Sequence, residues 1–313
     1  MTRIRKGVIT AAGRGTRQYP ASKTVQKELF PLVDVDGFAK PTVQILAEEL
    51  FASGLEEVCI VANPTNIEPM RRHFLEAPPA SLVGKDWAEA LTKSLADMAG
   101  RLTFVVQESQ DGYGHAVFQA RKFVGNEPFL ITLGDHVYLS KTDVPCAGQV
   151  MDVFSKYNAS VTSVSYAPEA ELHRFGTLTG LLLPGAMPPV YEIKALAEKP
   201  TVEYALAHLR APGVPEGRYL VHFGIHAFTP AIFDCLEHLI QNDIRQRGEI
   251  QLTSAQILLM ERERYLACEV AGARYDMGVP EGLIGTQIAL ALRSPFAAQA
   301  RAALSENQTQ RVQ

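Results

Sequence analysis

The sequence predicts an α/β fold, a Rossmann-like, doubly wound sheet that is mixed, mainly parallel, and extended by antiparallel strands in its second half. In the first half, short apolar runs typical of buried parallel strands alternate with segments that carry apolar residues at helical spacing. In the second half, strand-like runs follow one another across Pro- and Gly-rich loops, with fewer helices between them. Repeated strand–helix units place the strands in parallel and the helices against the sheet.

The first half divides into alternating elements. Apolar runs predict strands at residues 7–12, 56–63, 101–108 and 128–135. Helical spacing predicts helices at residues 42–52, 65–74, 87–98 and 114–125. Gly54 and Gly125 supply C-terminal stops for the first and last of these helices, and Thr65 with Glu68 predicts a capping box for the second.

The second half changes character. Strands are predicted at residues 160–167, 177–183, 190–198, 218–228 and 265–272, and helices at 230–242, 252–263 and, as one long helix, 280–304. No repeat or linker interrupts the chain. We therefore expect a single domain over residues 1–305, with an N-terminal half at about 1–140, a second half at about 141–280, a C-terminal helix at about 280–305 and a frayed polar tail at 306–313.

The composition limits the classes of function. The 313 residues are 47% hydrophobic and 20% charged, without an apolar run of the roughly 20 residues that a membrane span needs. The apolar part of the N-terminus is short and interrupted by Gly13, Arg14 and Gly15, which disfavours a signal peptide and favours a cytoplasmic protein. The four cysteines lie far apart without a CxxC pair, so we expect buried thiols and neither a zinc site nor disulfides.

Charge points to a small anionic substrate. The net charge of −4 gives no global attraction for nucleic acid or acidic membranes. Four cations nevertheless gather in one short segment, namely Arg14, Arg17, Lys23 and Lys27. A local cluster of this kind suits a polyanion such as a nucleotide.

The same segment contains a glycine loop directly after the first predicted strand. Glycines let the backbone approach a ligand, and exposed amides hold phosphate or a base edge. The loop lacks the third glycine of the dinucleotide fingerprint, because Gln18 stands there, and no GK[ST] follows. On its own, the loop fits a tight turn equally well.

The longer string carries more information. GRGTR at residues 13–17 and KELFP at 27–31 resemble the signature of the sugar nucleotidyltransferases, with a spacing similar to the bacterial UDP-glucose pyrophosphorylase family. Further elements resemble that family in order along the chain: Gln107, GYGHAV at 112–117, LGDHVY at 133–138, RFGTLTG at 174–180, AEKP at 197–200, GEIQLT at 248–253 and YDMG at 275–278.

The resemblance implies a nucleotide-diphospho-sugar transferase fold and an activity. The activity is Mg²⁺-dependent transfer of a uridylyl group from UTP to glucose 1-phosphate, which gives UDP-glucose and pyrophosphate. The resemblance also assigns Arg17, Lys27 and Lys199 to catalysis, and Asp135 and Asp276 to binding of the metal. Nucleotide binding falls to Ala11, Ala12, Gly13, Gly15, Gln107 and Gly112, and sugar phosphate binding to Gly176, Glu198, Lys199 and Gly224.

The chemistry asks for these residue types independently. The nucleophile is a phosphate oxygen that is already an anion, so no strong general base is needed. The difficulty lies in bringing two polyanions together, and positioning and electrostatics therefore dominate. Mg²⁺ prefers one or two carboxylates plus phosphate oxygens, which suits Asp135 at a predicted strand end together with Asp276.

Each assignment has a structural alternative. Asp135 could cap a turn, Asp276 before Gly278 could belong to an ordinary turn, and Glu198 with Lys199 could form a solvated ion pair. The histidines at positions 115, 222 and 226 are interpreted as structural. The sequence also departs from the family at the longer stretch 34–41, at Gly134, His136, Val137 and Ala197, and at Ile225 and His226, which bears on the sugar and nucleotide bound.

Three other readings stay open. One is uridylyl or thymidylyl transfer to another hexose 1-phosphate, such as that of galactose or glucuronic acid. Asp34-Val35-Asp36 matches the DxD motif of many glycosyltransferases, although Asp36-Gly37 also predicts a turn. A homologue that binds nucleotide sugars without turnover is the third. The family is commonly dimeric or tetrameric, and the apolar residues Ile284, Ile288, Leu290 and Leu292 would suit an interface or packing within the chain.

Overall fold

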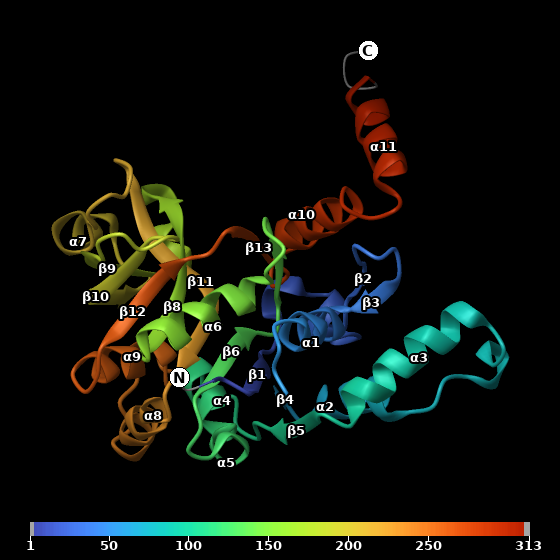
Figure 1. The fold of residues 1–313 in the computed structure, drawn as a ribbon, viewed down its shortest axis with the longest axis horizontal. Coiled ribbons are helices and arrows are strands. Elements are labelled where there is room, and N and C mark those ends of the chain that lie inside the picture. Colours follow the sequence, from blue (N-terminus) through green and yellow to red (C-terminus); the bar gives the residue numbers. More distant parts are fainter. Residues whose placement is uncertain (1–2, 310–313) are drawn as a thin grey trace.

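A mixed nine-stranded sheet forms the centre of the molecule (Figure 1), in the order β5-β4-β1-β6-β11-β8-β12-β10-β9. The computed structural model describes residues 3–309. The strands of this sheet are β1 (Lys6–Ala11), β4 (Glu57–Ala62), β5 (Leu102–Val106), β6 (Phe129–Leu133), β8 (Ser160–Pro168), β9 (Gly176–Leu182), β10 (Val190–Glu198), β11 (Arg218–Phe228) and β12 (Tyr265–Glu269).

The first half of the chain builds the parallel part of the sheet. Strand β1 pairs in parallel with β4 on one side and with β6 on the other, and β5 adds in parallel beyond β4. All but the first residue of β1 are buried, as expected of a parallel strand covered on both faces. The carboxyl ends of these strands therefore meet along one edge of the sheet.

The second half extends the sheet mostly in the antiparallel sense. Strand β11 pairs antiparallel with β6 and β8, and β10 pairs antiparallel with β12 and β9. Only β12 and β8 run parallel there among the described residues. The predicted antiparallel additions are thus present. The prediction that the whole sheet is mainly parallel holds only for the strands of the first half.

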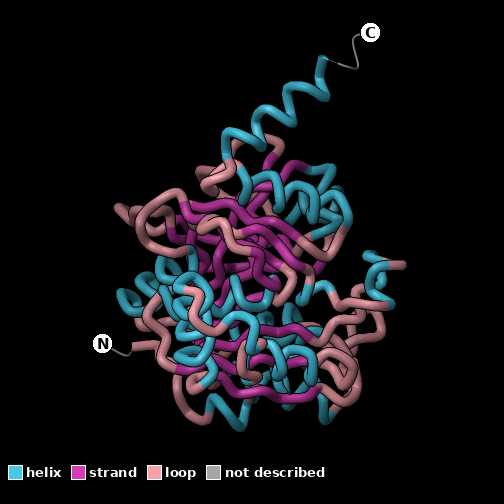
Figure 2. Tube along the Cα trace, turned by 90° about the vertical axis from the view of Figure 1, so that its right-hand side faces the viewer, coloured by secondary structure: helices cyan, strands magenta, loops and turns pink. Residues whose placement is uncertain are grey.

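Helices cover both faces of the sheet, as the two perpendicular views in Figures 1 and 2 show. They are α1 (Thr42–Ala52), α2 (Ile67–Leu75), α3 (Asp86–Ala99), α4 (Tyr113–Gln119), α5 (Arg121–Val124), α6 (Cys146–Tyr157), α7 (Val202–His208), α8 (Ala231–Gln241), α9 (Leu252–Met260), α10 (Pro280–Ala291) and α11 (Ala297–Thr309). Short 3-10 turns occur at Thr16–Gln18, Ala21–Lys23, Lys27–Leu29, Ala80–Leu82 and Glu169–Arg174.

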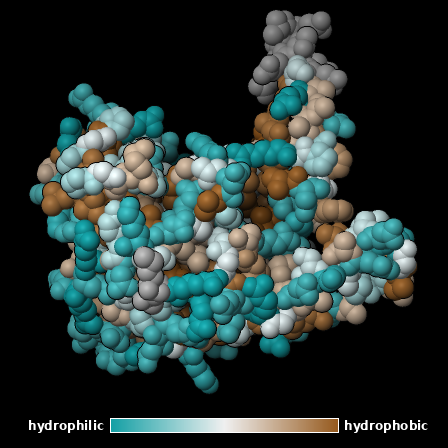
Figure 3. Space-filling model, viewed as in Figure 1, coloured by the Kyte–Doolittle hydropathy of each residue, from teal (hydrophilic) through white to brown (hydrophobic). Residues whose placement is uncertain are grey.

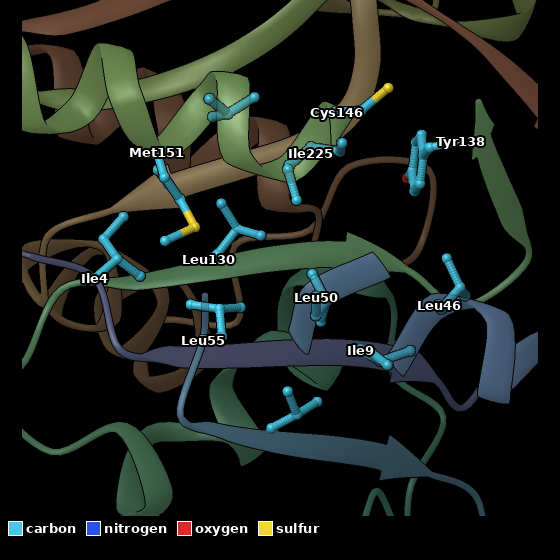
Figure 4. Close-up of a cluster of buried hydrophobic side chains, with 14 of the residues drawn as sticks. Ile4, Ile9, Leu46, Leu50, Leu55, Leu130, Tyr138, Cys146, Met151 and Ile225 are labelled. Carbon is cyan, nitrogen blue, oxygen red and sulfur yellow. The ribbon is translucent and has the colours of Figure 1, made fainter. Parts of the chain in front are cut away.

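The period of two in each strand divides the core between the two faces. Ile9 of β1 and Ile60 of β4 pack with α1 and α6 in the cluster of Figure 4, whereas Val8 and Val61 point to the opposite cluster with α4 and α8. All four cysteines are free and buried, as predicted.

Four sequence predictions need correction. The long C-terminal helix is two helices, since residues 292–296 separate α10 from α11 and Pro295 there cannot continue a helical hydrogen-bond ladder. The predicted helix at 114–125 likewise divides into α4 and α5. The capping box does not form, because the Thr65 hydroxyl donates to Asn63 Oδ1 at 2.6 Å. The fourth correction is the extent of parallel pairing given above.

Some elements were not predicted at all. Helices α6 and α7 are missing from the sequence prediction, as are the two-stranded sheets β2 (Pro31–Val33) with β3 (Ala39–Pro41) and β7 (His136–Ser140) with β13 (Gly272–Asp276). Their strands are only three to five residues long. Such short runs carry little periodic signal.

The C-terminal helices lie at the edge of the molecule. Helix α11 projects from the body in Figures 1 and 2, and hydrophobic surface gathers where α10 and α11 leave it (Figure 3). Ile284 and Ile288 are exposed and Leu290 is buried, so the predicted oligomer interface stays a prediction. Of the predicted tail, residues 310–313 lie outside the described part. Between residues 3 and 309, no helix has the length and apolar character that crossing a membrane requires.

Candidate active site

A cavity of about 680 Å³ lies at the carboxyl end of β1, where open α/β sheets usually bind ligands. The glycine loop forms one wall and the segment after β5 forms another. Its lining includes Ala12, Gly13, Arg14, Gly15, Thr16, Lys27, Gln107, Gln110, Gly112, Tyr113, Asp135 and Arg247. Ala11 is buried beneath it at the end of β1 and does not line the cavity.

The backbone of the glycine loop is fixed by side-chain amides. Asn66 Nδ2 donates to the Ala11 carbonyl at 2.7 Å, and Gln110 Nε2 donates to the Ala12 carbonyl at 2.7 Å. Both carbonyls are therefore satisfied within the protein. The arrangement holds the loop in one conformation before a ligand binds, which lowers the entropic cost of binding.

The opposite wall positions an amide side chain. Gln107 is buried, and its Nε2 lies 3.2 Å from the Gly112 carbonyl and 3.0 Å from His115 Nδ1. This leaves the carbonyl oxygen of Gln107 for a ligand. Gly112 has a φ of +109°, and a Cβ there would lie 2.6 Å from the Ile250 carbonyl oxygen, so only glycine fits.

The two predicted metal aspartates meet through strand pairing. Asp135 follows β6, and β7 continues directly from it. Strand β13 pairs antiparallel with β7 and sets Asp276 opposite His136. The Met277 amide donates to the Asp135 carbonyl at 2.7 Å, which ties the two segments together. Ligand atoms of Asp135, His136 and Asp276 all lie within 4.8 Å of one another.

The space between these carboxylates depends on Gly278. A Cβ at that position would lie 2.8 Å from Asp135 Oδ2, Asp276 Oδ1 and an Arg17 guanidinium nitrogen alike. The Gly278 amide donates to Asp276 Oδ1 at 2.7 Å and orients that carboxylate. Any side chain would fill the cradle, so the residues present fit a divalent cation with oxygen ligands and one neighbouring imidazole.

Lys27 and Asp135 form a buried charge pair. The Lys27 ammonium donates to Asp135 Oδ2, and His136 Nδ1 lies 2.8 Å from Oδ1. Burial alone would raise the pKa of Asp135, but Lys27 and His136 hold this pKa well below its ordinary value. Burial would likewise lower the pKa of Lys27, yet Asp135 and Glu28 raise it. Both groups are therefore charged at neutral pH.

Glu28 is a third titratable group beside Lys27 and Asp135. It is 1% exposed, its carboxylate lies 3.5 Å from Lys27 Nζ, and burial raises its pKa to about 7. A carboxyl whose pKa is higher in the folded state binds more protons there than in the unfolded chain between pH 4.5 and 7. The free energy of unfolding therefore falls as the pH rises through this window.

We expect Glu28→Gln to remove part of this pH dependence. The shift from 4.5 to about 7 corresponds to roughly 3 kcal/mol of unfolding free energy between pH 4.5 and 8. Urea denaturation at pH 5 and pH 8 would measure it, with the exposed Glu216→Gln as the control variant. An unchanged difference between the two pH values in Glu28→Gln would contradict the assignment.

A second cavity of about 550 Å³ adjoins the first and shares Lys27, Tyr113, Leu133, Asp135 and Glu249 with it. Its other lining residues include Arg17, His136, Arg174, Gly176, Glu198, Lys199, His222, Gly224, His226, Arg274 and Asp276. All predicted catalytic, sugar-phosphate and metal residues thus line this cavity. Their roles stay predictions.

The end of β10 presents the acid and base of the AEKP segment. Thr253 Oγ1 donates to Glu198 Oε2 at 2.7 Å, while Lys199 Nζ lies 3.6 Å from Glu198 Oε1 and is half-exposed. The Lys199 backbone adopts a φ of +46°, held by its amide on the Phe175 carbonyl at 3.1 Å. This uncommon conformation places adjacent side chains of opposite charge on the same cavity.

The DxD stretch lies in a hairpin. Asp34 and Asp36 belong to the turn between β2 and β3, with Gly37 at a φ of +87°. Lys40 Nζ contacts Asp34 at 2.9 Å and Asp36 at 2.6 Å, so both carboxylates bind an ammonium group of the chain itself. This arrangement agrees with a turn, and neither residue lines either cavity.

Comparison with known proteins adds to this geometry. The sequence model of the family described as Nucleotidyl transferase matches residues 6–291. The UTP--glucose-1-phosphate uridylyltransferase of Bacillus subtilis (strain 168) is 36% identical over 296 residues, which is 94% of this chain and 93% of the relative. The chain belongs to the nucleotidyl transferase family. A protein of the same name from Staphylococcus epidermidis is 35% identical over 306 residues, with 96% of each chain covered.

Solved structures agree with this membership of the nucleotidyl transferase family. A UDP-glucose pyrophosphorylase complexed with UDP-glucose is 30% identical with a TM-score of 0.74, and the match covers 91% of this chain and 98% of that one. The UDP-glucose pyrophosphorylase of Acinetobacter baumannii reaches a TM-score of 0.78 over 96% of this chain, at 22% identity. The α/β nucleotidyltransferase fold is thereby established.

Several residues that line the two cavities were not predicted from the sequence. Arg174, Arg247 and Arg274 add cations to the lining, and Gln110 supports the glycine loop. Arg247 stands directly before GEIQLT, and Arg274 stands two residues before Asp276. Their positions next to these motifs could have indicated that both arginines lie at the site. His222 and His226 also line the second cavity, although the sequence favoured purely structural roles for both.

Proposed function

We propose that the chain transfers a uridylyl group from UTP to glucose 1-phosphate and releases pyrophosphate, with Mg²⁺ as the cofactor. The observation that carries this proposal is the pair of adjoining cavities with Lys27 and Asp135 in their shared wall. A nucleotide in one cavity and a sugar phosphate in the other would bring the reacting phosphates together at these two side chains. The names of the relatives supply the identities of the two substrates.

The two halves of the chain divide this work in our proposal. Residues 1–140 of the single domain supply most of the first cavity and would bind the nucleotide. Residues 141–280 supply Gly176, Glu198, Lys199 and Gly224 to the second cavity and would bind the sugar phosphate. Arg247, Gly248 and Glu249 cross over to the first cavity. The parallel half of the sheet would then act as a Rossmann-like nucleotide platform.

The charges of the site suit the joining of two anions. Lys27 and Arg17 would contact the triphosphate, and Lys199 would contact the phosphate of the incoming sugar. Asp135 and Asp276 would hold Mg²⁺, with His136 as a neighbouring nitrogen donor. When bound, the cation neutralises charge on the phosphate oxygens. The protein contributes orientation and fixed counter-charges and needs no general base, because the attacking oxygen is already ionised.

Pyrophosphate release tests the proposal. UTP, dTTP, ATP, GTP and CTP are each combined with glucose, galactose and glucuronic acid 1-phosphates in the presence of Mg²⁺. We expect fast release with UTP and glucose 1-phosphate. A different preferred pair would keep the reaction and reassign the substrates. No release from any pair would overturn the proposal, and UDP-glucose transfer or hydrolysis would then be assayed.

Removal of the Lys199 charge is expected to affect one substrate only. Lys199→Ala deletes the counter-charge for the sugar phosphate, and a charge-assisted hydrogen bond contributes about 1.5–3 kcal/mol. The KM for glucose 1-phosphate should rise about 10- to 100-fold, with the KM for UTP within twofold. Lys194→Ala, at an exposed lysine on β10, the strand that ends just before Lys199, serves as the control. An equal rise in both KM values would reject the role.

A further inference from the structure

A buried polar network lies beneath the second cavity. Thr162 Oγ1 of β8 lies 2.8 Å from the Nδ1 atoms of both His222 and His226 on the adjacent strand β11. Gln256 of α9 extends the network, with its Nε2 at 3.3 Å from His226 Nδ1 and 2.8 Å from the Tyr265 hydroxyl. Thr162, His226 and Gln256 are each no more than 3% exposed. Polar groups so deeply buried are normally fully hydrogen-bonded.

One atom of the network is an exception. His222 Nε2 is buried and has no hydrogen-bond partner within residues 3–309, whereas its Nδ1 is held by Thr162. The same side chain lines the cavity that contains Glu198 and Lys199. A buried nitrogen without a partner costs about 1–3 kcal/mol, so its presence in a ligand cavity needs an explanation.

The position of this nitrogen is defined by Gly176. A Cβ built on Gly176 would lie 2.5 Å from His222 Cδ2, 3.3 Å from His222 Nε2 and 3.2 Å from Glu198 Oε2. A side chain at position 176 would therefore clash with the imidazole edge and crowd the carboxylate. Glycine leaves room for both side chains, which line the same cavity.

The network also sets which nitrogen of His222 carries the proton. Gln256 Nε2 can only donate, so His226 Nδ1 is an acceptor, and Thr162 must direct its single proton to that same atom at 2.8 Å. Thr162 then accepts from His222 Nδ1, which leaves a lone pair on Nε2. Burial and the nearby Arg274 lower the pKa of His222 to about 4, in agreement with a neutral ring.

We propose that His222 Nε2 accepts a hydrogen bond from one hydroxyl of the hexose and, with Glu198, selects the hexose 1-phosphate that the enzyme uses. This inference rests on the proposed function and deepens it by adding a specificity-determining residue. Two acceptors that lie next to each other on one cavity match hydroxyl donors. A sugar that lacks the matching hydroxyl would leave these buried acceptors without a hydrogen bond. A site of this kind discriminates strongly against such a sugar.

The test crosses His222 variants with glucose 1-phosphates that lack a single hydroxyl at C2, C3, C4 or C6. Wild type should lose roughly tenfold in kcat/KM with one of these analogues through this contact. His222→Leu should lose roughly tenfold with glucose 1-phosphate but nothing further with that analogue. His222→Gln, which restores a polar atom near Nε2, should recover most of the loss. The exposed His208→Gln is the matched control.

Binding without turnover separates this inference from the proposed function. Calorimetry should show that His222→Leu weakens UDP-glucose about tenfold and leaves the affinity for UDP unchanged. Equal losses with every deoxy analogue, or equal weakening of UDP and UDP-glucose, would mean that His222 is only structural and would overturn the inference, although an active wild type would leave the proposed function standing. A wild type without pyrophosphate release or UDP-glucose binding would remove both.

Discussion

Asp135→Asn is expected to reduce kcat for pyrophosphate release by on the order of 10³ at saturating UTP and glucose 1-phosphate, because a bound cation supplies several kcal/mol of charge stabilisation in such reactions. The amide keeps the shape of the side chain but removes one of the two carboxylates around the cradle above Gly278. The dependence on Mg²⁺ should shift to higher concentration at the same time. A magnesium titration of the initial rate measures both effects.

The structure also indicates which side effect must be controlled. Lys27 loses its nearer carboxylate in Asp135→Asn and keeps only Glu28 at 3.5 Å, and weakening a buried ion pair destabilises a fold. Thermal unfolding of the variant therefore accompanies the kinetics. Asp152→Asn makes the same chemical change at an exposed carboxylate on α6 and should alter neither property. Turnover within threefold of wild type in a folded Asp135→Asn variant would contradict the metal assignment.

The sequence predicted well the parts of the fold whose signal is local. The buried strands β1 and β4 appear as unbroken apolar runs, and the predicted bounds of α1, β10 and β11 agree with the structure. The motifs after these strands were placed at strand ends by the same reasoning. Since parallel strands share one direction, their carboxyl ends meet at one edge, and the convergence of the glycine loop with Asp135 was foreseeable.

The rest of the site depends on contacts between distant segments. Asp276 reaches Asp135 through the pairing of β13 with β7, two short strands that are more than 130 residues apart and carry no periodic signal of their own. The sequence matched YDMG to a motif but had no physical reason to bring it to LGDHVY. His222 is similar, since its free nitrogen becomes visible only once Thr162 and Gly176 are placed around it.

Two of the departures from the family, His136 and His226, line the second cavity. His136 lies beside Asp135 and Asp276, and His226 belongs to the polar network beneath this cavity. By contrast, the first cavity keeps the glycine loop and Lys27 in the recognised pattern. We expect these two changes to alter the choice of sugar phosphate before the choice of nucleotide, and the substrate panel should be interpreted in that order.

Lys27→Met is expected to reduce kcat by about 10²–10³, since removal of one fixed donor to a developing phosphate charge has effects of this size. Lys27 lines both cavities and donates to Asp135, so the variant loses the proposed contact to the reacting phosphates together with the ion pair to Asp135. Methionine fills similar volume without charge. Asp135 would then keep the His136 hydrogen bond but lose its ammonium partner, and its pKa should rise toward the ordinary range.

Two measurements separate these consequences. If Lys27 acts on the phosphates, kcat stays low at every Mg²⁺ concentration, whereas a purely supporting role for Asp135 predicts recovery once Mg²⁺ is saturating. The exposed Lys93→Met on α3 makes the same chemical change far from both cavities and should leave kcat unchanged. Because Lys27 lies in the shared wall of the two cavities, its removal should impair turnover with every hexose 1-phosphate to the same degree. A loss confined to one sugar would instead place Lys27 on the sugar side of the site.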